Sequence, residues 1–252
     1  MDAVETPDAK AILDQKRIAG LIPAAGSGVR MGGYAAKPFL QLGGREILAL
    51  TLDVFERCTI IDEVWVIVAA KNVSACRQGI IERYGFSKVR DVVAGGASRQ
   101  ESVWRGLQRL DGAVDLVVVH DGVRPFVTEL MLQETLDGAA RHGAAVAAVP
   151  LRDTLKRVSE GGEVEATVPR ENLWRTQTPQ AFQRHLLMMA YQRAWECGLC
   201  ATDDAGLLEA MGHPVKVVAG LEGNFKITTP EDLILSERLL RKLHAGEERS
   251  CG

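Results

Sequence analysis

Short apolar runs rich in β-branched residues recur along this chain, and longer amphipathic stretches separate several of them. The apolar runs predict strands over residues 17–23, 63–69, 89–94, 115–120, 144–151 and 215–218. Apolar positions spaced three or four apart predict helices over residues 47–58, 73–84, 98–110, 128–141, 183–197 and 230–243. Because strands alternate with helices, we expect an α/β fold with a mostly parallel sheet and helices on both of its faces.

The segment from residue 152 to residue 170 departs from this alternation. Two polar, alternating runs flank Glu160-Gly161-Gly162-Glu163, which is typical of a β-hairpin. The hairpin holds too few apolar residues for a core of its own, so it should lie on the main domain or reach out to a partner. The rest of the chain has no repeat or linker and predicts one domain over residues 17–244, between a flexible leader (1–16) and a C-terminal tail (245–252).

Composition and charge narrow the function classes. The chain has 252 residues, 46% of them hydrophobic and 25% charged, which is ordinary for a globular protein with a full core. A formal net charge of -3 argues against a dedicated nucleic-acid binder, and no apolar run is long enough to cross a membrane. The N-terminus is polar and acid-containing, unlike a signal or transit peptide. We therefore expect a cytoplasmic protein with no nucleic-acid or membrane partner.

The five cysteines form an odd and sparse set, which suggests reduced thiols. Cys197 and Cys200 form a C-x-x-C at the end of a predicted helix. A redox pair of this type usually opens a helix, where the helix dipole lowers the pKa of one thiol. The position therefore favours incidental thiols over a redox site.

A glycine-rich loop over residues 24–38 follows the first predicted strand and carries two cations, Arg30 and Lys37. Glycines let the backbone come close to a ligand, and a loop that leads from a strand to a helix suits a phosphate chain. Met31 stands where the dinucleotide fingerprint needs glycine, and no Gly-Lys-Ser/Thr follows, so neither an NAD-dependent dehydrogenase nor a Walker loop fits. The alternative is an ordinary tight turn with two surface cations.

A second turn follows the third predicted strand, from Gly95 to Ser102. Ser98 is placed as a helix N-cap and Glu101 stands three residues later, which is the pattern of a capping box. Capping explains both residues without any function. Gly96 and Ser102 are nevertheless placed to face a nucleobase or a ribose.

Asp121 ends the central apolar strand. A carboxylate is costly to bury there unless it is paired or binds a cation. Asp121 can serve as a ligand for Mg²⁺, which favours one or two carboxylates together with substrate phosphates. An ion pair between Asp121 and Arg124 that holds the turn is a second interpretation, compatible with the first. His120 is a single histidine after an apolar strand and is expected to be structural.

Three later motifs are each explained by structure alone when taken singly. Residues 177–180 predict a turn that leads into a helix, and Thr202-Asp203-Asp204 predicts a helix N-cap with acidic residues in the first turn. Lys226, shortly before the last predicted helix, is a third cation that can reach a phosphate.

Taken together, these pieces resemble the 2-C-methyl-D-erythritol 4-phosphate cytidylyltransferases, enzymes of the non-mevalonate isoprenoid pathway. The resemblance rests on P-A-A-G-S-G-V-R-M at 23–31 with Lys37, G-G-A-S-R-Q-E-S-V at 95–103, V-H-D-G-V-R-P at 119–125, T-P-Q-A-F at 178–182, T-D-D at 202–204 and N-F-K-I-T-T-P-E-D-L at 224–233. It implies a Rossmann-like α/β domain of the nucleotidyltransferase type, a homodimer with an exchanged hairpin arm, CTP as a substrate and Mg²⁺ as a cofactor.

The resemblance also implies a role for each matching residue. Arg30 and Lys37 would be the catalytic cations. The CTP-binding residues would be Ala24, Ala25, Gly26, Gly28, Gly96, Ser102, Asp121 and Lys226, and Asp121 would also face the metal. The acceptor-binding residues would be Asp121, Arg124, Arg170, Thr178, Thr202 and Lys226, with Arg170 and Thr202 placed in the site of the other subunit.

Two alternatives to this activity are weighed on the same residues. Gly122-Val123 replaces the more usual Ala-Ala, and the strings Val-Arg-Pro-Phe and Lys-Ile-Thr-Thr also occur in ribitol 5-phosphate cytidylyltransferases, which make CDP-ribitol. Thr202-Asp203-Asp204-Ala205 favours the methylerythritol acceptor. A nucleotide-binding protein without turnover would not need both Arg30 and Lys37.

Overall fold

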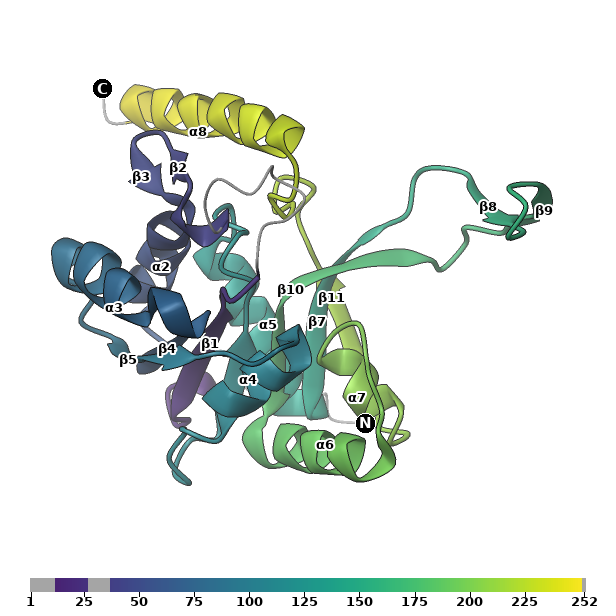
Figure 1. The fold of residues 1–252 in the computed structure, drawn as a ribbon, viewed down its shortest axis with the longest axis horizontal. Helices are drawn as coiled ribbons and strands as arrows, with labels where there is room; N and C mark the ends of the chain where they lie inside the picture. The colour runs from purple at the N-terminus through teal and green to yellow at the C-terminus, as the bar shows by residue number, and fades with distance from the viewer. Residues whose placement is uncertain (1–11, 27–36, 251–252) are drawn as a thin grey trace, which may run out of the picture.

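A seven-stranded sheet forms the centre of the computed structural model, which describes residues 12–26 and 37–250 (Figure 1). The strands lie in the order β11-β7-β10-β6-β1-β4-β5. Neighbouring strands are parallel except at β10, which runs antiparallel to both β6 and β7. The bounds are β1 (Ile18–Pro23), β4 (Glu63–Val68), β5 (Val89–Ala94), β6 (Leu116–Val119), β7 (Ala144–Pro150), β10 (Trp174–Gln183) and β11 (Lys216–Ala219). The predicted α/β class and mostly parallel sheet are confirmed.

Within the seven-stranded sheet, β10 is the strand that the sequence pattern did not predict. We expected a turn over residues 177–180, but Gln177 to Gln180 lie inside β10, in the interior of the sheet. Pro179 made the segment look like a turn because proline cannot donate to a strand ladder. The structure accommodates it with a cis Thr178–Pro179 peptide and a register shift against β7 between Thr176 and Gln180.

Helices cover both faces of the sheet, as predicted (Figure 1). One face carries α2 (Ile47–Arg57), α5 (Glu129–His142), α3 (Val73–Cys76) and the π-helical η4 (Arg77–Glu82). The other carries α4 (Arg99–Leu107), α6 (Arg184–Cys197) and α7 (Ala205–Glu209). The predicted helix over 73–84 is therefore divided into a short α-helix and a π-helix, and the helix predicted to end at 110 ends at 107.

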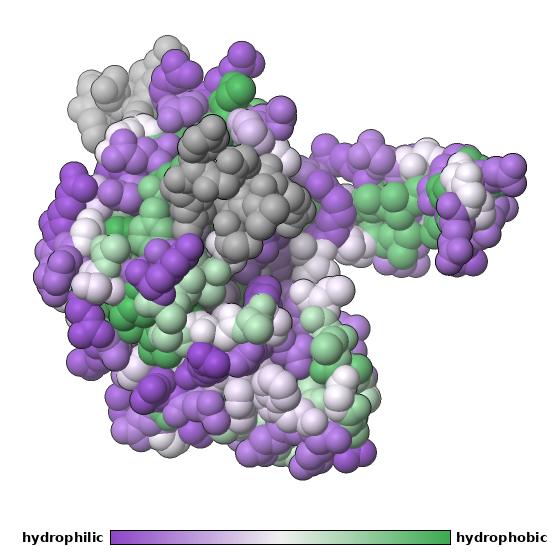
Figure 2. Space-filling view, in the orientation of Figure 1, coloured by the Kyte–Doolittle hydropathy of each residue, from purple (hydrophilic) through white to green (hydrophobic). Residues whose placement is uncertain are grey.

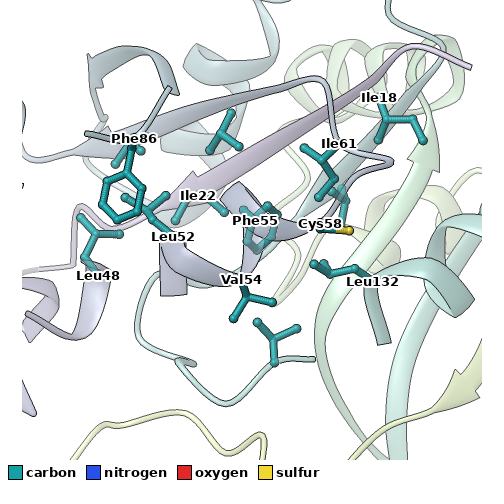
Figure 3. Close-up of a cluster of buried hydrophobic side chains, with 14 of the residues drawn as sticks. Ile18, Ile22, Leu48, Leu52, Val54, Phe55, Cys58, Ile61, Phe86 and Leu132 are labelled. Carbon is teal, nitrogen blue, oxygen red and sulfur yellow. The ribbon is translucent and has the colours of Figure 1, made fainter. Parts of the chain in front are cut away.

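The central strand β1 is buried on both faces, as its uninterrupted apolar sequence requires. Ile18 and Ile22 pack into the core beneath α2 and α5, shown with Phe55 in Figure 3, whereas Leu21 belongs to the core on the opposite face. At Gly20 a Cβ would lie 3.0 Å from the Phe55 ring, so the missing side chain lets that ring pack against the strand. The loop that follows β1 therefore begins at the end of a strand that is buried on both faces.

Both ends of the predicted domain extend further than expected. Leu13, which the sequence analysis assigned to the flexible leader, is buried in the core, so ordered packing begins before residue 17. At the other end, α8 (Pro230–Ser250) continues through most of the predicted tail. Helix α8 packs against β2 (Gln41–Leu42) and the turn after it. Strand β2 follows η2 (Lys37–Phe39) and pairs with β3 (Arg45–Glu46), and η3 (Ala70–Asn72) precedes α3.

The predicted hairpin forms an arm that projects from the body of the molecule (Figure 1). Its strands are β8 (Leu155–Val158) and β9 (Val164–Val168), and they pair antiparallel with each other alone. Hydrophobic residues lie exposed along the arm (Figure 2), among them Leu155, Val158 and Val164.

Among the residues that the structure describes, no helix is long and apolar enough to cross a membrane.

Candidate active site

Three of the predicted turns meet at one edge of the sheet, because the parallel strands β1, β4, β5 and β6 all end there. The turns are tied to neighbouring strands by backbone hydrogen bonds. The Ala24 amide donates to the Ile67 carbonyl at 2.6 Å, and the Gly95 amide donates to the Val68 carbonyl at 2.7 Å. The Gly122 amide donates to the Pro23 carbonyl at 3.2 Å. In open α/β sheets this edge is where ligands bind.

The turn from Gly95 to Ser102 is held by its own side chains. The Ser98 hydroxyl accepts from the Glu101 amide at 3.0 Å, which confirms the predicted N-cap, and the Glu101 carboxylate accepts from the Ala97 amide at 2.7 Å. The buried Ser102 hydroxyl donates to the Ser98 carbonyl and accepts from the Gly96 amide. The structure thus places the Ser102 hydroxyl inside the turn, where it shapes the backbone.

Three cations converge on the buried Asp121 carboxylate. Arg99 Nε donates to Oδ1 at 3.1 Å, and Lys226 Nζ donates to Oδ2 at 2.7 Å. The predicted partner Arg124 is farther away, with Nε 3.8 Å from Oδ2. The ion pair predicted for this turn is therefore present, but it is the weakest of three.

Burial and charge act in opposite directions on this cluster. Burial by itself would raise the pKa of Asp121, but Arg99 and then Lys226 outweigh it and hold that pKa well below its ordinary value. Burial likewise would lower the pKa of Arg99, and the Asp204 and Asp121 carboxylates together raise it above its ordinary value. Burial lowers the pKa of Arg124. At neutral pH Asp121 is an anion and its two arginine partners are cations.

Strand β10 approaches this cluster through the residues around Pro179. The Thr178 hydroxyl accepts from the Asp121 amide at 3.0 Å. The side-chain amide of Asn224, which is fully buried, donates to the Thr178 backbone carbonyl at 2.8 Å. The backbone carbonyl of Asn224 accepts from Arg124 Nη1 at 2.8 Å. Asn224 thereby fixes the segment that carries Lys226 to the interrupted part of β10.

His120 has a structural environment, as expected. It is buried, and its Nε2 donates to the Arg124 carbonyl at 3.0 Å. Burial lowers the pKa of His120 to about 4, against smaller opposing effects of the hydrogen bond to the Arg124 carbonyl and of the Asp121 charge. The ring is therefore neutral at pH 7 and is not a general acid there.

Comparison with known proteins supplies the family. The family model for IspD, 2-C-methyl-D-erythritol 4-phosphate cytidylyltransferase, matches residues 18–242, which is most of the chain. The chain belongs to the 2-C-methyl-D-erythritol 4-phosphate cytidylyltransferase family.

Similar sequences and structures agree with this family. The chain is 47% identical over 225 residues to the 2-C-methyl-D-erythritol 4-phosphate cytidylyltransferase of Geobacter metallireducens, covering 88% of this chain and 97% of the relative. The crystal structure of 4-diphosphocytidyl-2C-methyl-D-erythritol synthase from Anaerococcus prevotii is similar with a TM-score of 0.81 and 34% identity, over 92% of this chain and 99% of that one. The 2-C-methyl-D-erythritol 4-phosphate cytidylyltransferase of Thermus thermophilus is similar with a TM-score of 0.74 and 39% identity, over 89% and 99%.

The structure brings many of the family positions together. Asp121, Arg124, Thr178 and Lys226 form the cluster just described, and Gly96 lies in the adjacent turn. Ala24 is buried, Ala25 is half-buried, and Gly26 is exposed with open space where a side chain would stand. Gly28, Arg30 and the Lys37 side chain lie outside the described residues.

Two family positions stand apart from the cluster. Arg170 is exposed on the arm, where its guanidinium donates to the Arg152 carbonyl. Thr202 is exposed in the segment between α6 and α7. This segment differs from the prediction, because α7 begins at Ala205 and the Asp204 side chain makes no capping hydrogen bond. Asp203, one residue earlier, accepts from the Gly206 amide at 3.0 Å instead.

Arg99 and Asp204 were not predicted as site residues, although both stand in the motifs at 95–103 and 202–204. Arg99 is the first residue of α4, and a cation is unfavourable at a helix N-terminus unless an anion compensates. That unusual position was the available signal. Its partners, Asp121 and Asp204, are distant in the sequence, so the sequence pattern alone did not identify them.

Proposed function

We propose that this chain transfers the cytidylyl group of CTP to 2-C-methyl-D-erythritol 4-phosphate, which gives 4-diphosphocytidyl-2-C-methyl-D-erythritol and pyrophosphate. Family membership over residues 18–242 supports the activity. The observation that carries the proposal to this chain is the Asp121 cluster, where Arg124 and Lys226 meet a buried carboxylate beside the turn that holds Gly96. Such an arrangement suits a phosphate ester that must be oriented next to a nucleotide.

The cytidylyl transfer mainly requires cations that are held in position. The acceptor phosphate is already an anionic nucleophile at neutral pH, so neither a covalent intermediate nor a strong base is needed. The barrier comes from bringing two anions together and from charge that gathers on the α-phosphate. In our proposal Arg30 and Lys37 stabilise the α-phosphate and the leaving pyrophosphate. Ala24, Ala25, Gly26, Gly28, Gly96 and Ser102 form or support the surface against which CTP lies.

The acceptor half is assigned to the residues around Asp121. Lys226 keeps 38% of its side chain exposed while Asp121 holds its ammonium at 2.7 Å, so the cation is aimed and still accessible. Arg124 is more enclosed, with 12% exposed. We assign Lys226, Arg124 and Thr178 to the acceptor, with Asp121 as the anion that orients both cations.

The described residues could hold Mg²⁺ only together with ligands from the nucleotide phosphates. They contain no group of three or more His, Cys, Asp or Glu residues that would hold a metal ion. Asp121 offers one carboxylate at the strand end, and Mg²⁺ commonly takes one or two carboxylates together with substrate phosphates. Both oxygens of Asp121 are already engaged by Arg99 and Lys226. The CTP phosphates would therefore mainly hold the ion, with Asp121 facing it, and the ion would neutralise charge on the triphosphate when bound.

We infer that two copies of the chain associate through the arm, so that Arg170 and Thr202 complete the neighbouring site. The exposed Leu155, Val158 and Val164 on the arm support this inference, since apolar residues gathered on a projecting hairpin favour contact with a partner. A cytoplasmic location is inferred from the thiols: Cys58, Cys76, Cys197 and Cys200 are all free.

Mixing two inactive variants tests the shared site. If Arg170 acts in the partner's site, a heterodimer of Lys37→Ala and Arg170→Ala chains contains one intact site. Random reassociation should then restore about a quarter of wild-type activity. Sedimentation should show twice the 27.4 kDa chain mass. An active monomer, or no recovery on mixing dimers of proven subunit exchange, contradicts the placement of Arg170 and Thr202.

Pyrophosphate release tests the activity itself. With CTP and methylerythritol phosphate, the purified protein should release pyrophosphate with a kcat/KM at least about a hundredfold above that with ribitol 5-phosphate, because polar groups built for one acceptor are left unpaired by another. A preference for ribitol 5-phosphate would reassign the acceptor. CTP binding without pyrophosphate release in the presence of either acceptor would instead indicate a nucleotide-binding protein without turnover.

A further inference from the structure

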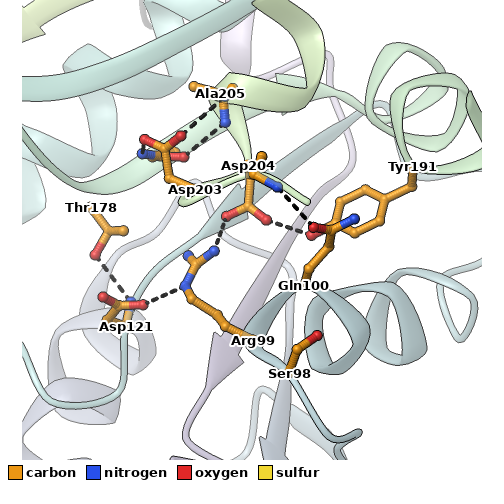
Figure 4. A network of polar contacts seen from close by, with 12 residues as sticks. Ser98, Arg99, Gln100, Asp121, Thr178, Tyr191, Asp203, Asp204 and Ala205 are labelled. Carbon is orange, nitrogen blue, oxygen red and sulfur yellow. Dashed lines mark hydrogen bonds and ion pairs between the residues drawn. The ribbon is translucent and has the colours of Figure 1, made fainter. Parts of the chain in front are cut away.

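Arg99 joins two buried carboxylates that belong to different parts of the fold (Figure 4). Its Nε donates to Asp121 Oδ1 at 3.1 Å, and its Nη1 lies 2.8 Å from Asp204 Oδ2. The other oxygen of Asp204 accepts from the Tyr191 hydroxyl at 2.6 Å. Asp121, Asp204 and Tyr191 are all buried, so these contacts form in a region of low dielectric where charge pairs are strong.

Each group in this chain of contacts lies next to a different part of the proposed site. Asp121 follows the end of β6 by two residues and holds Lys226. Asp204 closes the segment Ala201–Asp204, which carries Thr202; we call it the acceptor segment. Arg99 itself lies in the turn from Gly95 to Ser102 that contains Gly96, at the first position of α4. One guanidinium therefore links the nucleotide half of the site to the acceptor half.

A second contact ties the same elements together. Gln100, the next residue of α4, donates from Nε2 to the Leu199 carbonyl at 3.0 Å and accepts from the Ala201 amide at 3.1 Å. From the other side, Gln180 of β10 donates to the Asp203 carboxylate at 2.8 Å. The acceptor segment is thus fastened to the start of α4 and to β10, and Arg99 supplies its charged attachment.

The guanidinium of Arg99 is suited to this link, and its position would be unfavourable without the two carboxylates. Arg99 occupies the first position of α4, where the helix dipole disfavours a cation, so both carboxylates are needed to hold it there. The planar guanidinium presents Nε and Nη1 in fixed directions toward two acceptors. A lysine would carry the same charge but has a single ammonium, and it would lose the fixed geometry between Asp121 and Asp204.

We propose that Arg99 is a positioning residue of the cytidylyl transfer, which acts through Asp204 to fix the acceptor segment relative to Asp121 and the nucleotide turn. This inference rests on the proposed function. It concerns where the acceptor phosphate lies when CTP is bound, since small displacements of reacting groups lower the rate steeply.

Kinetics of three variants test the proposal. Arg99→Lys and Asp204→Asn should each raise the KM for methylerythritol phosphate about tenfold and lower kcat by about 10- to 100-fold, with the KM for CTP changed by less than about threefold. Tyr191→Phe, which removes one hydrogen bond to Asp204, should act in the same direction by about two- to tenfold in kcat/KM. Arg193→Lys, at an exposed position of α6, serves as the matched control and should behave as wild type.

The double variant Arg99→Lys/Asp204→Asn decides whether Arg99 acts through Asp204. If it does, the double variant should lose no more activity than the more affected single variant, because both substitutions break one link. Losses that multiply, or variants that are less heat-stable but keep wild-type kcat and KM, overturn the proposal. A wild-type protein that releases no pyrophosphate overturns the proposed function and this inference with it, whereas an active wild type with an equally active Arg99→Lys overturns the inference alone. Tyr191→Phe keeps the test informative if Arg99→Lys does not fold.

Discussion

Replacing Lys37 by alanine should lower the kcat of cytidylyl transfer by about 10²–10³-fold, by analogy with the loss of one preorganised oxyanion contact. Lys37 is proposed to stabilise charge that gathers on the α-phosphate and the leaving pyrophosphate. The effect should therefore appear in kcat, measured as pyrophosphate release at saturating CTP and acceptor. Heat stability should remain that of the wild type, because the predicted role needs the charge and not a buried contact.

The Lys37→Ala experiment needs a control lysine that lies outside the proposed site. Lys71, an exposed lysine of η3, serves as the matched control, and Lys71→Ala should leave turnover unchanged. A Lys37→Ala enzyme with near-normal kcat contradicts the assignment. A raised KM for CTP with unchanged kcat would show that Lys37 binds the nucleotide equally in the ground state and the transition state.

Replacing Asp121 by asparagine should damage both stability and activity. The substitution keeps the shape of the side chain but leaves Arg99, Arg124 and Lys226 without their common anion in a buried place. Removing one partner of a buried ion pair typically costs about 3–5 kcal/mol of unfolding free energy. With Lys226 no longer aimed, kcat/KM should fall by about a hundredfold or more. Urea unfolding and the pyrophosphate assay measure the two effects.

An exposed aspartate provides the comparison for Asp121. Asp111, with 63% of its side chain exposed, should lose less than about 0.5 kcal/mol on substitution by asparagine. Because the pKa of Asp121 is lowered in the folded protein, its stabilising effect is present at pH 7 and is lost only as the pH falls below the ordinary value of 3.8 toward the folded-state pKa. An Asp121→Asn protein as stable as wild type at pH 7 would show that the three cations do not depend on this carboxylate.

The pattern of neighbouring residues in the sequence was sufficient to predict those strands and helices whose structure depends mainly on their own residues. The apolar runs predicted the parallel strands, and Ser98 with Glu101 predicted the start of α4. Strand β10 was missed because Pro179 gives a turn signal locally, while the neighbours β6 and β7 decide its structure. The same reason applies to Asp121 and Lys226, which meet across 105 residues of sequence. Sheet topology, and not spacing along the chain, brings such partners together.

The antiparallel strand β10 also has a consequence for the order in which the protein can fold during synthesis. β10 lies between β6 and β7, yet residues 174–183 leave the ribosome after both of these strands. Until then, β6 has an unpaired edge on that side, and β7 lacks the neighbour through which it joins the rest of the sheet. Unpaired strand edges favour association between nascent chains, and pairing that is distant in sequence is slow. The hairpin arm directly precedes β10 in the sequence, so this projecting segment must leave the ribosome before the sheet can close.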